Sequence, residues 1–265
     1  MKATVFLGGG RITSALVAGL RLAGHERPIV VHDRHSKKLQ KLRRQHRVIV
    51  EEDLRRAVEL ADLLIVAVRP DSVRELLQEI REQHLRRRLT AVSLAAGIPL
   101  SKLQAALGLP VRWMRAMPSP VCRSGRGLTA LTFGRGVSPA ERATVRDLFA
   151  SVGTVVEIPE RRFDAFTVTY SSSHGYHALA ALVGAAEAIG LDRKTALIAA
   201  AHALADGIAS WRASNLSLEK LLKEAATPGG VAAAVMAALD KAGYRRIVKT
   251  GLCAGIRRAR KNAER

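Results

Sequence analysis

Through the first 158 residues, short apolar runs alternate with longer segments whose apolar residues recur at helical spacing. Runs rich in Val, Ile and Leu predict strands, and the segments between them predict helices. The predicted strands are 5–7, 28–32, 48–50, 63–68, 90–94, 111–116, 129–133 and 154–158. The predicted helices are 14–22, 37–45, 53–60, 72–83, 99–108 and 139–152. Strict alternation of the two predicts an α/β class with a mostly parallel sheet.

The pattern changes after residue 158, where strand-like runs give way to helices rich in alanine. The predicted helices are 178–189, 192–211, 218–226, 231–242 and 246–261. Between residues 178 and 209, apolar positions cover more than one helix face. Helices of this kind bury a second face against another subunit. The pattern therefore predicts two domains, 1–158 and 159–265, the second all-helical and responsible for dimerisation.

Three glycines, Gly8, Gly9 and Gly10, join the first predicted strand to the first helix. Gly8 and Gly10 match the first two glycines of the fingerprint G-x-G-x-x-G, in which a dinucleotide pyrophosphate meets the helix N-terminus. Thr13 stands at the third position and predicts a slightly shifted helix. A plain tight turn is the alternative. We expect a Rossmann-like, doubly wound sheet whose cofactor contacts here include Gly8, Gly10, Arg11 and Ile12.

The end of the second strand bears on the choice between NAD and NADP. An acidic residue at this point binds the ribose hydroxyls of NAD, and a nearby arginine accommodates the 2′-phosphate of NADP. Asp33 and Arg34 therefore favour different cofactors. Arg34 with Ser36 offers a charged, hydrogen-bonding place for a phosphate, so we favour NADP, with NAD possible. The alternative is a simple helix start, with Ser36 as N-cap.

Composition limits the other classes. The chain of 265 residues carries a net charge of +20, but only 4% of its residues are aromatic, which argues against specific nucleic-acid binding. No apolar run is long enough for a membrane span and no signal peptide is evident, so we expect a cytoplasmic protein without a membrane partner. Cys122 and Cys253 lie far apart and are expected to be reduced thiols. No spacing of carboxylates and histidines suggests a metal site.

Four motifs follow the glycines in order: A-V-R-P at 67–70, S-L-A-A-G at 93–97, R-A-M-P at 115–118 and T-P-G-G at 227–230. Together they make the chain resemble the pyrroline-5-carboxylate reductases over nearly its whole length. The resemblance implies a Rossmann domain, a helical dimerisation domain, and a homodimer or larger homo-oligomer. It also implies reduction of a small-molecule cyclic imine, 1-pyrroline-5-carboxylate, to the amino acid proline with NAD(P)H, a step of proline biosynthesis.

The resemblance and the strand ends together assign further site residues. Additional cofactor contacts are expected at Val68, Arg69, Pro70, Ala95, Met117 and Pro118. Substrate contacts are expected at Ser119, Ser173, Thr227, Gly229 and Gly230. The expected catalytic residues are Ser172, His174 and Tyr176, of which the last two are candidate proton donors to the imine nitrogen. The alternative for Tyr176 is packing at a dimer seam.

Several positions depart from the family pattern. Ser119-Pro120-Val121 replaces N-T-P, His174 replaces a proline, and Val231-Ala232 replaces two threonines. Those threonines help to hold the substrate carboxylate in the family, and losing one hydrogen bond to a charged group costs about 1.5–3 kcal/mol. The sequence therefore supports the cofactor half of the site better than the substrate half.

Three alternatives remain open at this point. The chain resembles 3-hydroxyacid dehydrogenases less well, because their catalytic lysine has no counterpart between residues 171 and 191. An imine reductase with a different substrate would explain the altered loops. A non-catalytic, regulatory NADP-binding protein would explain them as well.

Overall fold

In a computed structural model, the structure describes residues 3–85 and 87–264. The chain divides into two compact units. One, called here the sheet unit, comprises residues 1–170 and 254–265, and the other, the helical unit, comprises residues 171–253. The sequence placed a domain boundary after residue 158, and that boundary stays a prediction.

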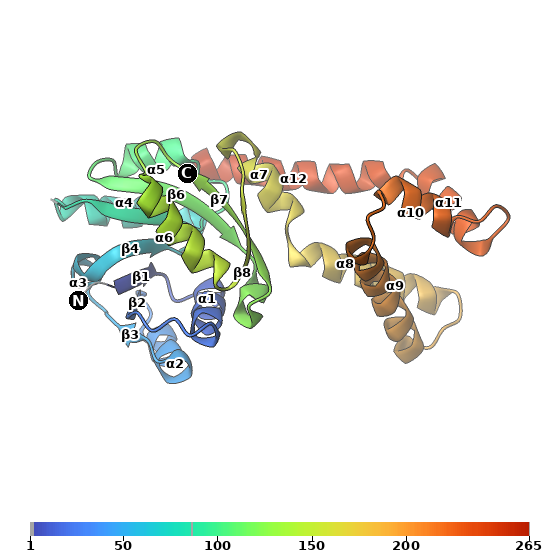
Figure 1. The fold of residues 1–265 in the computed structure, drawn as a ribbon, viewed down its shortest axis with the longest axis horizontal. Coiled ribbons are helices and arrows are strands. Elements are labelled where there is room, and N and C mark those ends of the chain that lie inside the picture. Colours follow the sequence, from blue (N-terminus) through green and yellow to red (C-terminus); the bar gives the residue numbers. More distant parts are fainter. Residues whose placement is uncertain (1–2, 86, 265) are drawn as a thin grey trace. The chain divides into compact units, whose positions relative to one another are not determined.

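Within the described residues, the sheet unit is built on one eight-stranded sheet, with strand order β3-β2-β1-β4-β5-β6-β7-β8 (Figure 1). The strands are β1 (Ala3–Leu7), β2 (Ile29–His32), β3 (Ile49–Val50), β4 (Ala61–Val66), β5 (Leu89–Ser93), β6 (Val111–Pro118), β7 (Gly127–Phe133) and β8 (Gly153–Glu157). Neighbouring strands run parallel except β6 and β7, which are antiparallel. The predicted α/β class with a mostly parallel sheet is confirmed.

Helices cover both faces of this sheet. They are α1 (Arg11–Leu22), α2 (Ser36–His46), α3 (Leu54–Leu60), α4 (Val73–Glu82), α5 (Leu100–Ala106), α6 (Pro139–Ala150) and α7 (Glu160–Thr169), with short 3₁₀ turns η1 (Pro70–Ser72) and η2 (Pro120–Ser124). Along β1, Phe6 packs with α1, α2 and α6, whereas Val5 and Leu7 pack with α3, α4 and α5. Because successive residues of a strand point to opposite faces, one apolar run fills two cores. The doubly wound arrangement is confirmed.

Local hydrogen bonds explain several helix starts, and the start of α2 corrects one expectation. Asp53 caps α3 by accepting from the N–H of Arg56, and Ser138 with Glu141 forms a capping box on α6. Ser36 is not the N-cap of α2 but its first residue, since α2 begins one residue earlier than its lysines suggest. Asp71 precedes α4 but does not cap it, because Asp71 lies in η1 and accepts from the hydroxyl of Ser72.

The described residues of the helical unit form helices joined by short turns and loops, without a strand, as the sequence predicts. They are α8 (Ser172–Ala188), α9 (Arg193–Ala213), α10 (Leu218–Ala225), α11 (Val231–Lys241) and the first part of α12 (Tyr244–Glu264), whose remainder belongs to the sheet unit. The unit has a small core of Val183, Ala196 and Ala200. Among the described residues, no helix combines the length and the apolar character that crossing a membrane requires.

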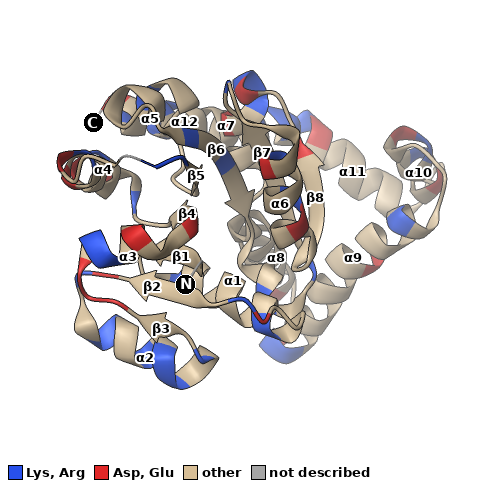
Figure 2. Ribbon diagram, turned by 60° about the vertical axis from the view of Figure 1, so that its left-hand side comes forward, with Lys and Arg blue, Asp and Glu red and all other residues tan. Residues whose placement is uncertain are grey.

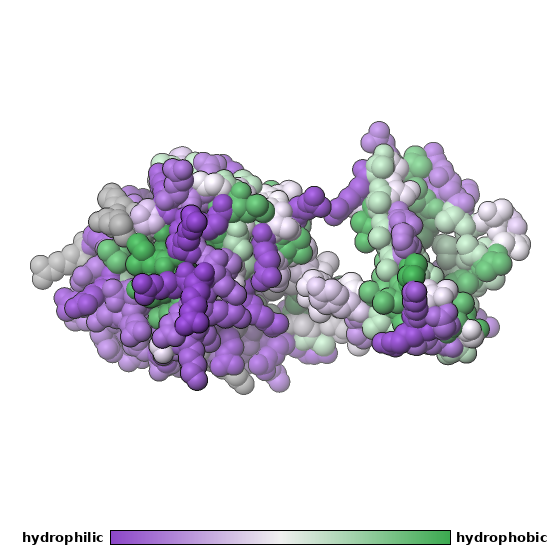
Figure 3. Space-filling view, turned by 90° about the horizontal axis from the view of Figure 1, so that it is seen from below, coloured by the Kyte–Doolittle hydropathy of each residue, from purple (hydrophilic) through white to green (hydrophobic). Residues whose placement is uncertain are grey.

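Much of the apolar surface of the helical unit is open to solvent in a single chain. The view in Figure 3 shows apolar residues gathered over these helices, whereas polar residues dominate the sheet unit on the same face. The exposed large apolar side chains of α8 to α11 include Leu182, Leu197, Ile198, Ile208, Trp211, Leu222, Val231, Val235 and Leu239. Exposed apolar surface of this extent is typical of an interface with another protein chain.

Candidate functional site

The glycine turn after β1 leaves space at the N-terminus of α1. Gly8 has a φ of +110°, and a Cβ there would collide with the carbonyl group of Ala67 on β4's side of the turn. Gly10 is the N-cap residue of α1, makes no side-chain cap, and has no atom within 4 Å of the place a Cβ would occupy. The first N–H groups of α1 therefore face open space, as an anion site requires.

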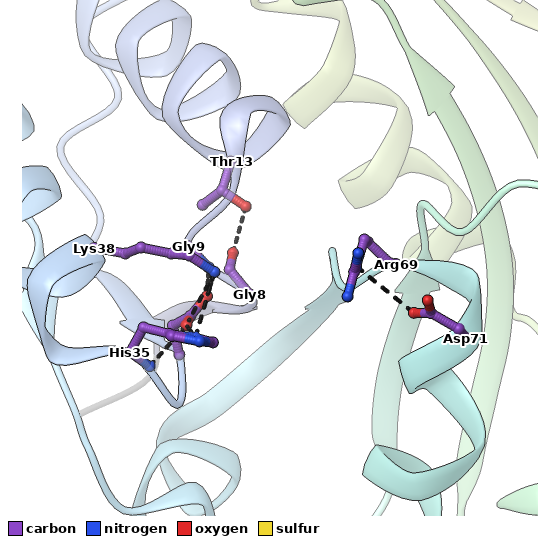
Figure 4. Close-up of polar contacts among 8 residues, drawn as sticks. Gly8, Gly9, Thr13, His35, Lys38, Arg69 and Asp71 are labelled. Atoms are coloured by element: carbon purple, nitrogen blue, oxygen red, sulfur yellow. Dashed lines mark hydrogen bonds and ion pairs between the residues drawn. The ribbon is translucent and has the colours of Figure 1, made fainter.

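Thr13 stands where the fingerprint has its third glycine. Its side chain is fully buried, and its hydroxyl donates to the carbonyl oxygen of Gly8 at 2.5 Å (Figure 4). The hydrogen bond satisfies a buried hydroxyl and fixes the turn, so the substitution is compatible with the strand–turn–helix geometry. The slight shift of α1 expected from Thr13 stays a prediction.

Asp33 braces the same turn from the end of β2. Its Oδ2 accepts from the N–H of Gly9 at 2.7 Å and its Oδ1 accepts from the N–H of His35 at 2.9 Å, while Nζ of Lys38 lies 3.3 Å from Oδ2 (Figure 4). Burial raises the pKa of Asp33, but these hydrogen bonds outweigh it and bring the pKa below its ordinary value. The Asp33 carboxylate, which the sequence analysis considered as a ligand of the NAD ribose, thus already accepts hydrogen bonds from other groups of its own chain.

Arg34 reaches across to α4. Its Nη1 lies 3.0 Å from Oε2 of Glu75, and its Nη2 donates to Oε1 of Glu79. The hydrogen bond to Glu75 is the main reason why the pKa of Arg34 lies above its ordinary value. On the other side of the turn, Nε of Arg69 lies 3.7 Å from Oδ1 of Asp71 (Figure 4). Arg34 and Arg69 therefore both have carboxylate neighbours.

These groups line a cleft of about 530 Å³ where β1, β2 and β4 end. Its lining is Leu7, Gly8, Gly10, Arg11, His32, Asp33, Arg34, His35, Lys38, Ala67, Val68, Arg69, Ser72 and Leu76. The carboxyl ends of parallel strands are where such sheets bind ligands. An open helix N-terminus, cationic side chains and an apolar wall at Leu76 fit the phosphates and the adenine of a dinucleotide.

The cleft brings together seven of the predicted cofactor residues and leaves out six. Those present are Gly8, Gly10, Arg11, Asp33, Arg34, Val68 and Arg69, and those outside its lining are Ile12, Ser36, Pro70, Ala95, Met117 and Pro118. Sequence reasoning overlooked the other seven lining residues, which are Leu7, His32, His35, Lys38, Ala67, Ser72 and Leu76. The spacing of His35 and Lys38 after the second strand carried the signal, because both follow Asp33 within five residues.

The residues after β6 hold the local backbone. Ser119, expected to contact substrate, is nearly buried and caps η2 by accepting from the N–H of Val121 at 3.2 Å. Cys122 on η2 packs in the core with α1, and burial raises the pKa of its thiol to about 11. Cys122 and Cys253 are both free thiols.

The arginine of the R-A-M-P motif is a buried structural anchor. Nη1 of Arg115 lies 2.9 Å from Oε1 of Glu160 and Nη2 lies 3.0 Å from Oδ1 of Asp164, and the guanidinium stacks on Phe163. The same Glu160 oxygen accepts from the N–H of Leu100, the first residue of α5. Arg115 thus ties β6 to α7 and α5, a role that the motif did not reveal.

The glycine of the S-L-A-A-G motif also has a packing role. Gly97 has a φ of +80°, and a Cβ on it would collide with the backbone of Ala259 on α12. Nearby, Nδ2 of Asn262 donates to the carbonyl oxygen of Ala96 at 3.2 Å. The last turns of α12 therefore rest on the loop after β5.

The predicted catalytic residues lie at the start of α8 in the helical unit. Ser171 caps this helix, and its hydroxyl lies 2.7 Å from the hydroxyl of Ser173. Ser172, His174 and Tyr176 fall in the first turns, where Tyr176 is 72% exposed. One helix end therefore collects these side chains, and the roles proposed for them stay predictions.

The T-P-G-G motif forms a turn before α11. The N–H of Gly230 donates to the carbonyl oxygen of Thr227 at 2.8 Å, and Gly229 has a φ of +77°, as a type II turn requires. Gly230 is the N-cap residue of α11, without a side-chain cap. Since its N–H serves the turn, the free donors at this point are those of the next residues, beginning with Val231.

Comparison with known proteins agrees with this arrangement. A family model described as NADP oxidoreductase, coenzyme F420-dependent matches residues 4–97, and one described as pyrroline-5-carboxylate reductase dimerisation matches residues 160–262. The pyrroline-5-carboxylate reductase of Corynebacterium melassecola is 31% identical over 92% of this chain and 93% of its own. That of Mycobacterium tuberculosis is 30% identical over 98% of this chain and 96% of its own.

Solved structures give the same result at the level of the fold. The enzyme of Streptococcus pyogenes aligns with a TM-score of 0.88 at 25% identity, and that of Plasmodium falciparum, solved with NADP bound, with a TM-score of 0.87 at 20% identity. Each alignment covers 98% of both chains. The resemblance seen in the motifs is thereby confirmed, and the chain belongs to the pyrroline-5-carboxylate reductase family.

Proposed function

We propose that this protein reduces 1-pyrroline-5-carboxylate to proline with NADPH, and also accepts NADH. The observation that carries the proposal is the open N-terminus of α1 at Gly10, set in a cleft where β1, β2 and β4 end. Membership of the family supplies the reaction. The relative from Plasmodium falciparum, solved with NADP bound, supports the choice of cofactor.

The chain's own residues have distinct tasks in this proposal. The N–H groups of Arg11 and Ile12 bind the pyrophosphate beside Gly10, and Arg34 with Lys38 meets the ribose phosphate. When bound, the nicotinamide supplies the hydride that reduces the imine carbon. Holding the nicotinamide and the imine in the correct relative orientation provides most of the rate enhancement. The protein therefore needs few reactive side chains.

The helical unit contributes the substrate contacts in this proposal. Tyr176 or His174 supplies a proton to the imine nitrogen, with Ser172 and Ser173 as further hydrogen-bonding partners. The turn at Thr227 and Gly229 presents the N-terminus of α11 to the substrate carboxylate.

Turnover with pyrroline-5-carboxylate tests the proposal. Loss of NADPH absorbance should depend on added pyrroline-5-carboxylate and should be matched by proline formation. Replacing His174 with Ala should lower kcat by about a hundredfold if it acts as the acid. The matched control is His177→Ala on the same helix, which should leave kcat unchanged. NADPH binding without reduction of any imine would instead favour a regulatory protein.

A second candidate is the reduction of an imine without a carboxylate. Val231, the first residue of α11, is 83% exposed and offers no hydroxyl where the family has threonine. Comparing kcat/KM for pyrroline-5-carboxylate and for 1-pyrroline distinguishes the two, since only the first carries a carboxylate. Equal values would favour this second candidate.

The proposal includes a homodimer formed through the helical unit, and a cytoplasmic location. Exposed apolar side chains on α9 and α11 and the match to a dimerisation family support the dimer. Two free cysteines support a reducing compartment.

A further inference from the structure

Two carboxylates on α4 hold the guanidinium of Arg34. Glu75 and Glu79 are four residues apart, so they share one face of the helix. Oε2 of Glu75 lies 3.0 Å from Nη1 of Arg34, and Oε1 of Glu79 accepts from Nη2. Arg34 keeps 52% of its side chain exposed within this grip.

Arg34 also lines the cleft beside the glycine turn, together with His35 and Lys38. Nζ of Lys38 lies 3.3 Å from the carboxylate of Asp33, so this cation too has an acidic partner. Around the place where a ribose phosphate would meet Arg34, the cationic side chains of Arg34 and Lys38 thus already have carboxylate partners. Figure 2 shows the same mixture of acidic and basic segments near the end of β2.

We propose that Glu75 and Glu79 are positioning residues that set cofactor specificity: they compete with the 2′-phosphate of NADPH for Arg34, and so narrow the preference for NADPH over NADH. This inference rests on the proposed function. Both glutamates act through Arg34 and need no contact with the cofactor.

The electrostatics gives the direction of the effect. A guanidinium has five N–H donors in one plane, and here donors on both Nη atoms already face carboxylates. A phosphate dianion must displace them or share the cation with them, and it is also repelled by their charge. Exposed ion pairs are weak, so displacement is feasible without rebuilding the loop. NADH carries no 2′-phosphate and escapes this competition.

Nucleotide fragments measure the effect without turnover. Calorimetric titration of the full-length protein with 2′,5′-ADP and with 5′-AMP isolates the contribution of the 2′-phosphate. In the double variant E75Q/E79Q, affinity for 2′,5′-ADP should rise by about threefold to tenfold. Affinity for 5′-AMP should change by less than about twofold. The affinity for NADPH should change as that for 2′,5′-ADP does, and the affinity for NADH as that for 5′-AMP does.

Two further variants separate specific contact from bulk charge. Glu82→Gln removes a charge from the same helix at a residue outside the Arg34 ion pairs, and should leave the ratio of the two affinities unchanged. In an R34Q background, E75Q/E79Q should no longer alter that ratio, because the cation for which the glutamates compete is gone.

The outcomes separate this inference from the proposed function. A fall in 2′,5′-ADP affinity in E75Q/E79Q would overturn the inference, since the glutamates would then be presenting Arg34 to the phosphate. An unchanged ratio, or an equal gain in Glu82→Gln, would overturn it as well. In each of these cases NADPH still binds and the proposed function stands. Failure of NADPH and NADH to bind at all would overturn both.

Discussion

At the scale of single residues, the first two glycines of the fingerprint, Gly8 and Gly10, differ in backbone conformation and in surroundings. Gly8 adopts a φ of +110° against the backbone of Ala67, so the fold itself excludes a side chain there. Gly10 has φ −79° and ψ −173°, which any residue adopts, and its surroundings are open. The structure therefore requires glycine at Gly8, whereas no neighbour within 4 Å excludes a Cβ at Gly10, where the proposed cofactor would approach.

This difference predicts different outcomes for two alanine variants. Gly10→Ala should leave the melting temperature unchanged. It should weaken the binding of NADPH by at least about tenfold, because a methyl group would occupy the approach to the helix N-terminus. Gly8→Ala should lower the free energy of unfolding by more than about 1 kcal/mol as well. Differential scanning fluorimetry with and without NADPH checks both. Normal NADPH affinity in Gly10→Ala would show that no phosphate approaches there.

The sequence identified residues of the cleft better than their partners. Gly8, Gly10, Asp33 and Arg34 were found because a strand followed by glycines, and a charged strand end, are local patterns. The ion pairs of Arg34 with Glu75 and Glu79 join positions more than 40 residues apart. Only the pairing of β1 with β2 and β4 brings them together, and no local pattern encodes it.

At the scale of elements, α6 is fastened to β5 by one carboxylate. Glu141 accepts from the N–H and hydroxyl of Ser138 in the capping box, from Thr90 at 3.1 Å and from Arg88 at 2.8 Å. Burial raises the pKa of Glu141, but the hydrogen bonds from Arg88 and Ser138 outweigh it, and the pKa falls to about 2. The ionised form therefore stabilises the folded state.

Glu141→Gln should lower the free energy of unfolding by about 1–3 kcal/mol at pH 7. Because the folded pKa of about 2 lies below the ordinary value of 4.5, this contribution is full above pH 4.5 and disappears as the pH falls to about 2. Urea unfolding over this range measures it. The control Glu59→Gln removes an exposed partner of Arg55 and should change stability by less than about 0.5 kcal/mol. A pH-independent difference would contradict the argument.

The elements that periodicity missed depend on distant partners. Helix α7 was not predicted, and its side chains Glu160, Phe163 and Asp164 all face Arg115 on β6. Its apolar spacing is weak because polar side chains on its inner face are paired with a buried cation. A pattern of apolar residues alone does not register such a face.

At the scale of the whole molecule, the last residues of the chain belong to the sheet unit, together with residues 1–170. In the last turns of α12, the backbone of Ala259 packs against Gly97. The side chain of Asn262 donates a hydrogen bond to Ala96, which lies 166 residues earlier in the sequence. The sequence assigned all residues after 158 to one domain, since helical composition is continuous there, and that boundary stays a prediction. Composition distinguishes a helical segment from an α/β segment. It does not predict that the end of a helical segment packs on the sheet unit, because that contact depends on the three-dimensional fold.

The apolar surface of the helical unit leads to a prediction about assembly. Ile198 on α9 is 54% exposed, in a unit whose described core contains only three fully packed residues. Ile198→Glu places a charge on surface that the proposed dimer buries, and an unpaired buried charge strongly disfavours association. Sedimentation velocity should therefore show a shift from dimer to monomer.

The matched control is Leu22→Glu, which adds the same charge at an exposed apolar residue of α1 in the sheet unit. It should leave the dimer intact, because the apolar residues that the proposed interface buries lie on α8 to α11. Loss of the dimer in both variants would point to net charge as the cause, and a dimer in both would place the interface elsewhere. Only dissociation confined to Ile198→Glu fits a helical unit completed by a second copy of itself.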